Sequence, residues 1–450
     1  MATSSVQPAR GTRDFLPADV RRREFVIGVV RDVYERYGFE PLETPAFENI
    51  ETLLGKYGEE GNKLIFKILK RGEHEGSGEA DLALRYDLTV PLARVVAQYQ
   101  NELPKFFKRY QIQPVWRADR PARGRFREFY QCDIDAVGST SLVVEAELLG
   151  AVVEVMTRLG FGDFVVRLNH RRLLSALLEQ AGLQPAQHGE ALIAIDKLDK
   201  LDRAQVQRDM VARGIDDAIA GRCLDAFTGS QSGGNVARLE SLGALLSSHE
   251  AGARAVADLI ELIRLCDRAE EAGRIRLDLS LARGLSYYTG AIMEIAVEGI
   301  GSLGGGGRYD NLVGMFLGRD VPACGFSLGL ERIIVVMAER GMFPPSADRA
   351  VVDVVVTFMD DQSRGEALVL ASELRTLGRR VDVYPDASRK FDKALKYATG
   401  RGARVMAIFG ENERQNQQTS VRNLLTREQT AVSRPETAAY ITGLLSQQNP

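Results

Sequence analysis

The segment from residue 104 to residue 130 combines a high density of positive charge with aromatic side chains. Eight of its residues are Lys or Arg and only two are acidic, although the whole chain has a net charge of −3. Guanidinium groups match phosphate oxygens in geometry, so the run suits a polyphosphate or a nucleic-acid backbone. A solvated hairpin tip would show the same charge run, and composition alone leaves both interpretations open. The basic residues are Lys105, Lys108, Arg109, Arg117, Arg120, Arg123, Arg125 and Arg127, interleaved with Phe107, Tyr110, Trp116, Phe126 and Phe129.

Two sets of polar side chains alternate along expected strands so that each set shares one face. An extended chain points successive side chains to opposite sides, and residues two apart therefore lie together. Carboxylates on such a face can hold an ammonium group, and a second carboxylate can orient a protonatable ring. Surface acids on a one-sided sheet would give the same pattern. The sets are Gln131, Asp133 and Asp135 in FYQCDID, and Arg85, Asp87 and Thr89 in ALRYDLT.

The segment LARGLSYYTG brings an arginine and two adjacent phenols together around a glycine turn: Arg283, Tyr287 and Tyr288. A phenol and a carboxylate can together pair with both nitrogens of an imidazole, one as donor and one as acceptor. Two buried tyrosines with satisfied hydroxyls would explain the same pair.

The glycine run in GSLGGGGRYD indicates a place where the backbone approaches another group closely, because glycine has no β-carbon. We expect that approach at Gly305, Gly306 and Gly307. The run lacks the ending of a phosphate-binding P-loop and is not a dinucleotide fingerprint, and a flexible loop would also contain such a run. In GFSLGLERI, Arg332 opens an apolar helix, where it would be either a salt-bridged structural residue or a phosphate ligand.

Composition excludes several classes of protein. A hydrophobic content of 45% and a charged content of 26% exclude a disordered or collagen-like chain. No apolar run reaches the roughly 18 residues that span a bilayer, and MATSSVQPARGTRDF has no apolar core typical of a signal peptide. The cysteines are far apart and the histidines isolated, which predicts neither a disulfide framework nor a structural metal site. We therefore expect a cytoplasmic protein without membrane contact.

The elements that must position these residues change character along the chain. Short strands with few helices between them favour an antiparallel sheet over residues 1–183, after an opening helix at residues 20–37. Charged helical pieces and the linker TGSQSGG predict a helical insertion over residues 184–258. Strand-like sequence returns over residues 259–345. Residues 346–450 then alternate strand and helix, as in a small α/β domain with a mainly parallel sheet.

In this order, the segments resemble class II aminoacyl-tRNA synthetases, and within them the histidyl-tRNA synthetase family, over essentially the whole chain. ARGTRDFLP is similar to the family's N-terminal signature, GFEPLETPAFE to motif 1, residues 107–135 to motif 2 and GFSLGLERI to motif 3. LARGLSYYTG and GGGGRYDNL resemble two histidine-specific signatures that other class II enzymes lack. The resemblance implies an α+β catalytic domain on an antiparallel sheet, a helical insertion and a C-terminal α/β anticodon-binding domain.

The resemblance also implies roles for individual residues. At the α-amino group of the substrate it places Asp87, Thr89 and Gln131, and at the imidazole Asp135, Tyr287 and Tyr288. Arg117 and Arg283 would contact the α-phosphate and the substrate carboxylate, and Arg332 the far phosphates. Arg125 and Phe129 would complete the ATP site.

The implied reaction joins histidine to tRNA(His) in two steps, through histidyl-adenylate. The implied partners are L-histidine, ATP with its Mg²⁺, tRNA(His) and a second copy of the chain in a homodimer. The alternative is a non-catalytic relative with a synthetase-like fold, the regulatory subunit of ATP phosphoribosyltransferase. That alternative predicts eroded catalytic arginines and no anticodon-binding domain, whereas this chain retains Arg117, Arg283 and Arg332 and continues for roughly 100 residues after Pro345.

Overall fold

The main sheet has eight strands, and its five inner pairings are antiparallel while its two outer pairings are parallel. The computed structural model describes residues 6–72, 76–199, 201–228, 233–266, 273–282, 287–345, 347, 352–387 and 391–447. The expected α+β fold on an antiparallel sheet is confirmed for this part of the chain. In spatial order the strands are β1 (Glu40–Pro41), β5 (Phe107–Trp116), β6 (Glu128–Val137), β11 (Ala323–Gly329), β10 (Gly301–Arg308), β9 (Ala291–Val297), β7 (Phe164–His170) and β8 (Ile275–Leu277).

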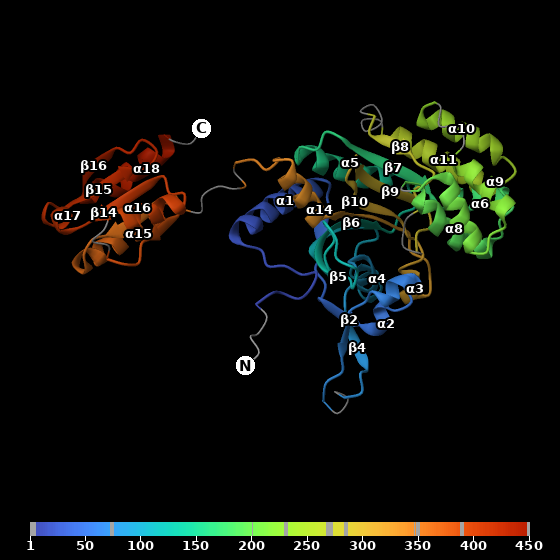
Figure 1. Cartoon of the computed structure of the whole chain (residues 1–450), viewed down its shortest axis with the longest axis horizontal. Helices are drawn as coiled ribbons and strands as arrows, with labels where there is room; N and C mark the ends of the chain where they lie inside the picture. The colour runs from blue at the N-terminus through green and yellow to red at the C-terminus, as the bar shows by residue number, and fades with distance from the viewer. Residues whose placement is uncertain are drawn as a thin grey trace. The chain divides into compact units, whose positions relative to one another are not determined.

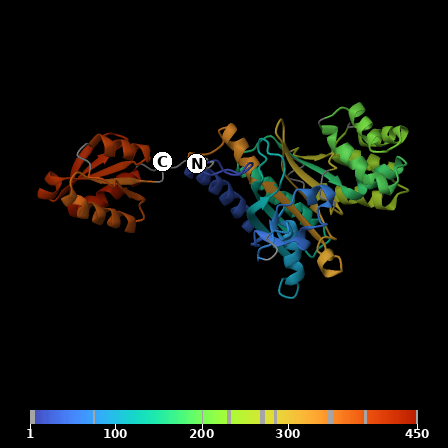
Figure 2. The same cartoon turned by 60° about the horizontal axis from the view of Figure 1, so that its bottom comes forward.

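Three helices pack against this sheet and against one another (Figures 1 and 2). They are α1 (Pro17–Arg36), α5 (Val143–Arg158) and α14 (Leu330–Glu339). Helix α1 begins with a proline, which suits the first helical turn because its missing N–H has no partner there. Its Val26, Val30 and Val33 recur at helical spacing and are fully buried, so this face of α1 forms part of the core.

A smaller sheet and several short helices form a second core. The prediction of a strand through ALRYDLT is wrong beyond Leu84. The strand ends at Leu84 and a helix begins at Thr89, where the Asp87 carboxylate accepts a hydrogen bond from the backbone N–H of Val90 at 3.1 Å and so satisfies a donor of the first helical turn. The elements are β2 (Phe47–Asn49), β4 (Ala80–Leu84) and β3 (Lys67–Leu69), with α2 (Ile50–Leu53), α3 (Gly58–Lys63), α4 (Thr89–Gln98) and α13 (Gly314–Leu317).

The expected insertion is helical, and its buried side chains belong to the same core as the main sheet. In Figures 1 and 2 these green helices gather beside the end of the sheet formed by β7 and β8. The boundary expected after residue 258 falls inside α11, so the helical segment continues to Leu265. Helix α6 (Arg171–Gln180) precedes the expected insertion and packs against α9 and α11. The elements of the insertion are η2 (Pro185–Gln187), α7 (His188–Ile195), η3 (Asp196–Asp199), α8 (Arg203–Ala212), α9 (Asp217–Thr228), α10 (Asn235–Leu245) and α11 (Glu250–Leu265).

Residues 344–450 form a second unit with a five-stranded sheet and its own core. Its α/β character is confirmed, but two of its four strand pairings are antiparallel, because a hairpin follows the third strand of the sequence. The prediction of a mainly parallel sheet overlooked that hairpin. In spatial order the strands are β13 (Val381–Val383), β12 (Val354–Phe358), β14 (Val405–Phe409), β15 (Gln418–Asn423) and β16 (Gln429–Ser433), with η4 (Asp361–Ser363), α15 (Arg364–Thr376), α16 (Phe391–Gly400), α17 (Glu411–Gln415), η5 (Arg434–Glu436) and α18 (Thr437–Gln447).

The glycine run is a central strand, β10, and not a flexible loop. A β-carbon on Gly306 would overlap the backbone of Gly325 and Phe326 on the neighbouring strand, and one on Gly307 would lie 2.5 Å from the carbonyl oxygen of Ala291. The strands can therefore approach this closely only because these positions carry no side chain.

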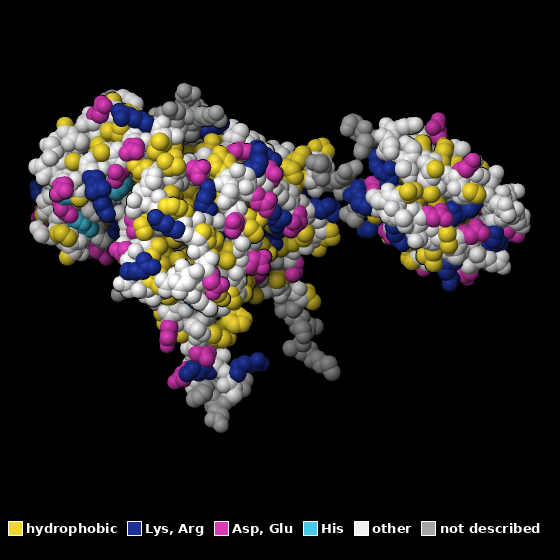
Figure 3. Space-filling model, turned by 180° about the vertical axis from the view of Figure 1, so that it is seen from behind, with side chains coloured by type: hydrophobic (Ala, Val, Ile, Leu, Met, Phe, Trp, Pro, Cys, Tyr) yellow, Lys and Arg dark blue, Asp and Glu magenta, His cyan; other side chains and the backbone are white. Residues whose placement is uncertain are grey.

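The surface carries both signs of charge. Figure 3 shows Lys and Arg side chains interspersed with Asp and Glu over the visible face, in agreement with the small net charge. Among the described residues, no helix combines the length and the apolar character that crossing a membrane requires.

Candidate active site

The register of the central strands lines up a row of polar side chains across one face of the main sheet. Asp133 of β6 pairs with Gln111 of β5 on one side and with Ser327 of β11 on the other. Ser327 pairs in turn with Gly305 of β10, and Gly305 pairs with Glu294 of β9. Directly opposed residues of antiparallel strands share a face, so side chains from four segments of the sequence meet here.

A buried ion pair lies one pleat further along the strands. Arg109 Nη2 is 2.8 Å from Asp135 Oδ2 and 4.0 Å from Asp133 Oδ2, and all three side chains are buried. The Tyr309 hydroxyl donates a hydrogen bond to Asp135 Oδ1. A β-carbon on Gly325, the cross-strand neighbour of Asp135, would overlap that carboxylate. Glycine at residue 325 therefore leaves the space in which the Asp135 carboxylate lies.

Three buried carboxylates share this part of the cavity. Burial raises the pKa of Asp133 to about 7, with the Asp135 charge adding to the increase and Arg109 opposing it. Burial also raises the pKa of Asp135, where Arg109 opposes it, and of Asp87, where the hydrogen bond from Val90 and the charge of Arg117 do so. A cationic ligand would offset part of the cost of burying these charges. The arrangement suits an ammonium group or a protonatable ring.

Asp87 reaches the cavity from the turn between β4 and α4. Its Oδ1 accepts a hydrogen bond from the Tyr57 hydroxyl at 2.9 Å besides the one from Val90. Its buried Oδ2 has no hydrogen-bond partner among the described residues. Because the neighbouring Thr89 also lines the cavity, this turn offers a ligand both an acceptor and a hydroxyl.

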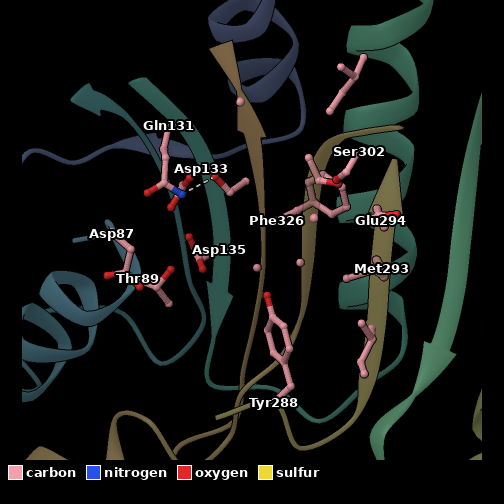
Figure 4. Close-up of a pocket in the computed structure, with 18 of the residues that line it drawn as sticks. Asp87, Thr89, Gln131, Asp133, Asp135, Tyr288, Met293, Glu294, Ser302 and Phe326 are labelled. Carbon is pink, nitrogen blue, oxygen red and sulfur yellow. Dashed lines mark hydrogen bonds between the residues drawn. The ribbon is translucent and has the colours of Figure 1, made fainter. Parts of the chain in front are cut away.

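A cluster of phenols closes the cavity opposite the carboxylates. The Tyr288 hydroxyl points toward Asp133 and Asp135 (Figure 4). The Tyr287 ring meets the rings of Tyr288 and Tyr309 edge-on, with centroids 5.3 and 5.8 Å apart. Burial raises the pKa of Tyr287 and Tyr288 above the usual range, so both phenols stay protonated and can donate.

Guanidinium groups line the other end of the cavity. Arg117 donates from Nε to the carbonyl oxygen of Tyr86 at 3.0 Å, and its guanidinium lies between the rings of Tyr86 and Phe129, at 4.4 and 5.1 Å from their centroids. Arg332 Nη1 donates to the carbonyl oxygen of Ser302. Arg125 lines the same cavity and is exposed. This end suits a polyphosphate.

Both interpretations of the basic segment, residues 104–130, apply to part of it: some of its arginines line the cavity, and another is exposed as in a solvated hairpin tip. Arg117 and Arg125 face the cavity, Arg109 is buried beneath it, and Arg123 is exposed and paired with Glu339 as a hairpin tip would be. Tertiary structure assigns each arginine a different environment.

Most of the residues expected at the site meet in one cavity of about 450 Å³. Gly307 does not line the cavity; it lies behind Tyr288, and a β-carbon at this position would be 3.2 Å from the Tyr288 ring. Arg85, expected beside Asp87, instead donates to the carbonyl oxygens of Thr44 and Pro114 in the core. Arg283 falls outside the described residues. The expected residues that line the cavity are Asp87, Thr89, Arg117, Arg125, Phe129, Gln131, Asp135, Tyr287, Tyr288, Gly305, Gly306 and Arg332.

The sequence prediction missed residues that line the cavity, among them Tyr309 and Glu294, and two that hold its carboxylates, Arg109 and Tyr57. Arg109 was counted only within the basic run, although a strand period places it opposite Asp135 once the pairing of β5 and β6 is known. Tyr309 lies within GGGGRYD, but the sequence does not show that its side chain points toward Asp135. No sequence motif or residue spacing indicated that Tyr57 would contact Asp87. Glu294, which lines the cavity, is held by Arg167 Nη1 at 2.7 Å on the next strand.

No group of three or more His, Cys, Asp or Glu side chains arranged to hold a metal ion occurs among the described residues.

Comparison with known proteins decides between the possible families. The family model for histidyl-tRNA synthetase matches residues 11–333, and an anticodon-binding-domain model matches residues 351–444. A Gloeobacter violaceus protein named histidine–tRNA ligase is 42% identical over 97% of this chain and 98% of its own length. The chain belongs to the histidyl-tRNA synthetase family.

Solved structures agree with this membership. The crystal structure of histidyl-tRNA synthetase from Nostoc sp. PCC 7120 has a TM-score of 0.80 and 31% identity, and the alignment covers 98% of this chain and 100% of that one. A Bacillus halodurans C structure, described as an ATP phosphoribosyltransferase regulatory subunit/histidyl-tRNA synthetase, has a TM-score of 0.72 at 20% identity, covering 91% of this chain and 99% of that one. At that identity the likeness shows the fold alone, and fold by itself does not establish function.

Proposed function

We propose that this chain is a histidine–tRNA ligase, which activates L-histidine with ATP and transfers histidine to the 3′ end of tRNA(His). The observation that supports this most is the convergence of Asp135, Tyr288 and Arg117 on one cavity. Acids and a phenol suit an amino acid with an imidazole ring, and guanidinium groups suit a triphosphate. The curated relative named histidine–tRNA ligase supports the same assignment.

At the amino-acid end, Asp87, Thr89 and Gln131 would bind the α-ammonium group. The unpaired Oδ2 of Asp87 is a suitable acceptor for one of its protons. Asp135 and Tyr288 would hold the two ring nitrogens, one accepting and one donating, and Tyr287 would pack beside the ring. A site that pairs both nitrogens rejects analogues that lack them, because its own polar groups would be left unpaired.

In the activation step, an oxygen of the histidine carboxylate attacks the α-phosphorus of ATP and the bond to the pyrophosphate oxygen breaks. Arg117 would stabilise negative charge on the α-phosphate oxygens, with Arg283 beside it as the family resemblance implies. Arg332 would hold the departing pyrophosphate, while Arg125 and Phe129 contact the nucleotide. Catalysis then consists of positioning and charge stabilisation.

The family requires ATP, and with it Mg²⁺. Mg²⁺ binds oxygen ligands and commonly takes one or two carboxylates together with phosphates of the substrate. Glu294 lines the cavity, and its carboxylate is the type of ligand that Mg²⁺ binds. When bound with ATP, the ion would neutralise phosphate charge.

In the second step, a hydroxyl of the terminal tRNA ribose attacks the activated carbonyl and AMP leaves. Residues 346–450 would contact the anticodon, and the helices over residues 184–258 would lie near the acceptor stem. We also propose that the chain acts as a cytoplasmic homodimer through its motif 1 region, residues 38–48, and sedimentation of the purified protein tests the dimer.

The experiment that tests the proposed function is ATP–pyrophosphate exchange with a panel of amino acids. We expect exchange with histidine alone, followed by charging of tRNA(His). Exchange with another amino acid would point to a different class II synthetase. No exchange at all would favour the regulatory relative.

A further inference from the structure

The N-terminal segment, residues 9–15, is docked on the loop that carries the phosphate-binding arginines. That loop, residues 117–127, connects β5 to β6 and is called the motif 2 loop below. The Arg117 backbone N–H donates to the Arg127 carbonyl oxygen at 2.9 Å, and the Arg127 N–H donates to the Gly11 carbonyl oxygen at 2.8 Å. The N-terminal segment therefore extends a ladder of backbone hydrogen bonds whose innermost member is Arg117.

The contact depends on the residue type at Gly11. Its φ is +88°, a conformation in which other residues are strained. A β-carbon there would lie 2.8 Å from Arg127 Cγ and 2.9 Å from Pro121 Cγ. A side chain at residue 11 would push the segment away from Pro121 in the middle of the motif 2 loop and from Arg127 at its end.

Arg13 fixes a second point of the same loop through aromatic rings. Its guanidinium lies 4.0 Å from the centroid of Phe126 and 4.5 Å from that of Phe15. Among the described residues, its buried Nε and Nη2 have no hydrogen-bond partner. The ring faces are therefore its main anchor. Phe126 follows Arg125, and both line a smaller cavity of about 270 Å³ that adjoins the main one.

The same stack continues to motif 3. The Arg23 guanidinium lies 3.6 Å from the Phe15 centroid, and its Nη2 is 3.2 Å from Glu331 Oε1. Glu331 Oε2 accepts the backbone N–H of Tyr130 at 2.8 Å and precedes Arg332 in sequence. One set of contacts thus joins the N-terminal segment to both elements that would bind ATP phosphates.

We infer that the N-terminal segment orients the motif 2 loop for ATP binding, with Gly11 and Arg13 as positioning residues. This inference rests on the proposed function for the identity of the nucleotide. It assigns a purpose to the ARGTRDF motif, whose residues do not themselves line the main cavity.

The test compares ATP affinity with histidine affinity in the full-length chain. Trp116, the single tryptophan, ends β5 next to Arg117, so its fluorescence can follow an ATP titration without turnover. In Gly11→Ala we expect the ATP midpoint and the KM for ATP in pyrophosphate exchange to rise about tenfold or more, because small displacements of positioned groups are costly. The KM for histidine should change by less than about twofold, since the N-terminal segment contacts only the phosphate end.

Two further variants separate positioning from stability. Arg13→Ala should raise the ATP midpoint in the same direction, and Arg13→Lys, which keeps a cation over the rings, should restore part of the affinity. Gly160→Ala is the matched control: Gly160 has the same φ as Gly11, +88°, but a β-carbon there would meet nothing nearer than Met342 Cε at 3.6 Å, an ordinary contact. It should lose stability by backbone strain alone and keep the ATP midpoint.

An unchanged ATP midpoint in folded Gly11→Ala or Arg13→Ala would overturn the inference, as would an equal rise in the KM for histidine. If Gly11→Ala does not fold, Arg13→Ala decides the matter alone. A wild-type chain without histidine-dependent exchange would refute the proposed function, and the tryptophan titration would still test the positioning of the loop.

Discussion

At the scale of single residues, the central feature is a carboxylate held in place from two sides. Asp135 forms an ion pair with Arg109 and accepts a hydrogen bond from Tyr309, while a neighbouring glycine leaves room for it. Such fixed partners orient a carboxylate before the ligand arrives, which reduces the ordering that binding requires.

Asp135→Asn should therefore abolish histidine activation while the fold survives. An amide keeps the shape but removes the charge, so kcat/KM for histidine in pyrophosphate exchange should fall by about 10²-fold to 10⁴-fold. Tyr309→Phe removes one hydrogen bond only, and we expect about a tenfold loss. Wild-type exchange activity in Asp135→Asn would show that the imidazole binds elsewhere.

Asp133 predicts a pH dependence of stability. Burial lifts its pKa from 3.8 to about 7, so between these pH values the folded chain holds a proton that the unfolded chain has lost. Stability from this group is therefore highest near pH 4, falls as the pH rises toward 7, and is constant above that. Asp133→Asn mimics the protonated form and should raise Tm relative to the wild type at pH 8, with a smaller difference at pH 5. Calorimetry at both pH values checks this, and a Tm difference independent of pH would contradict it.

At the scale of elements, neighbouring antiparallel strands share the site between them. β5 and β6 supply the charges, and β10 and β11 supply glycines and Ser327 beside them. Gln131 Nε2 on β6 donates a hydrogen bond to Ser327 Oγ on β11 at 2.7 Å, so side chains as well as backbone join these two strands.

Gly325→Ala should damage histidine binding through this strand pairing. The added methyl group would overlap the Asp135 carboxylate, and we expect the KM for histidine to rise about tenfold together with a loss of about 1–3 kcal/mol in stability. Gly329→Ala on the same strand is the matched control, because its β-carbon would lie 3.4 Å from the nearest atom, an ordinary contact. Equal effects of the two substitutions would argue against a specific role for Gly325.

At the scale of the whole molecule, the chain divides after Phe343 into two units with separate cores. The cavity is built entirely from residues 87–332. The described lining of the cavity therefore belongs to the first unit.

A chain ending at Phe343 should keep most of its histidine-dependent pyrophosphate exchange and lose most of its tRNA(His) charging. Circular dichroism and thermal unfolding would show that the shortened chain folds. A loss of both activities in equal measure by a folded chain would contradict this division of labour.

The sequence by itself determined which residue types form the site and, through their alternation along a strand, which of them share a face. Alternation in FYQCDID placed Gln131, Asp133 and Asp135 on one face, and β6 bears this out. Such patterns are local, because a strand sets the direction of each side chain within a few residues. The motif order also indicated the family, and the comparisons showed it.

Tertiary structure alone decided which groups meet. Arg109 and Asp135 are 26 positions apart, and only the register of β5 with β6 makes them an ion pair. The strand predicted through Asp87 ends at Leu84, and the Asp87 carboxylate instead pairs with the Val90 N–H in the first turn of a helix, which the alternation of residue types does not reveal. The glycine run was ambiguous until neighbouring backbones were seen on both sides of it. Contacts between segments distant in sequence come from packing the whole core at once, and a local pattern carries no information about that packing.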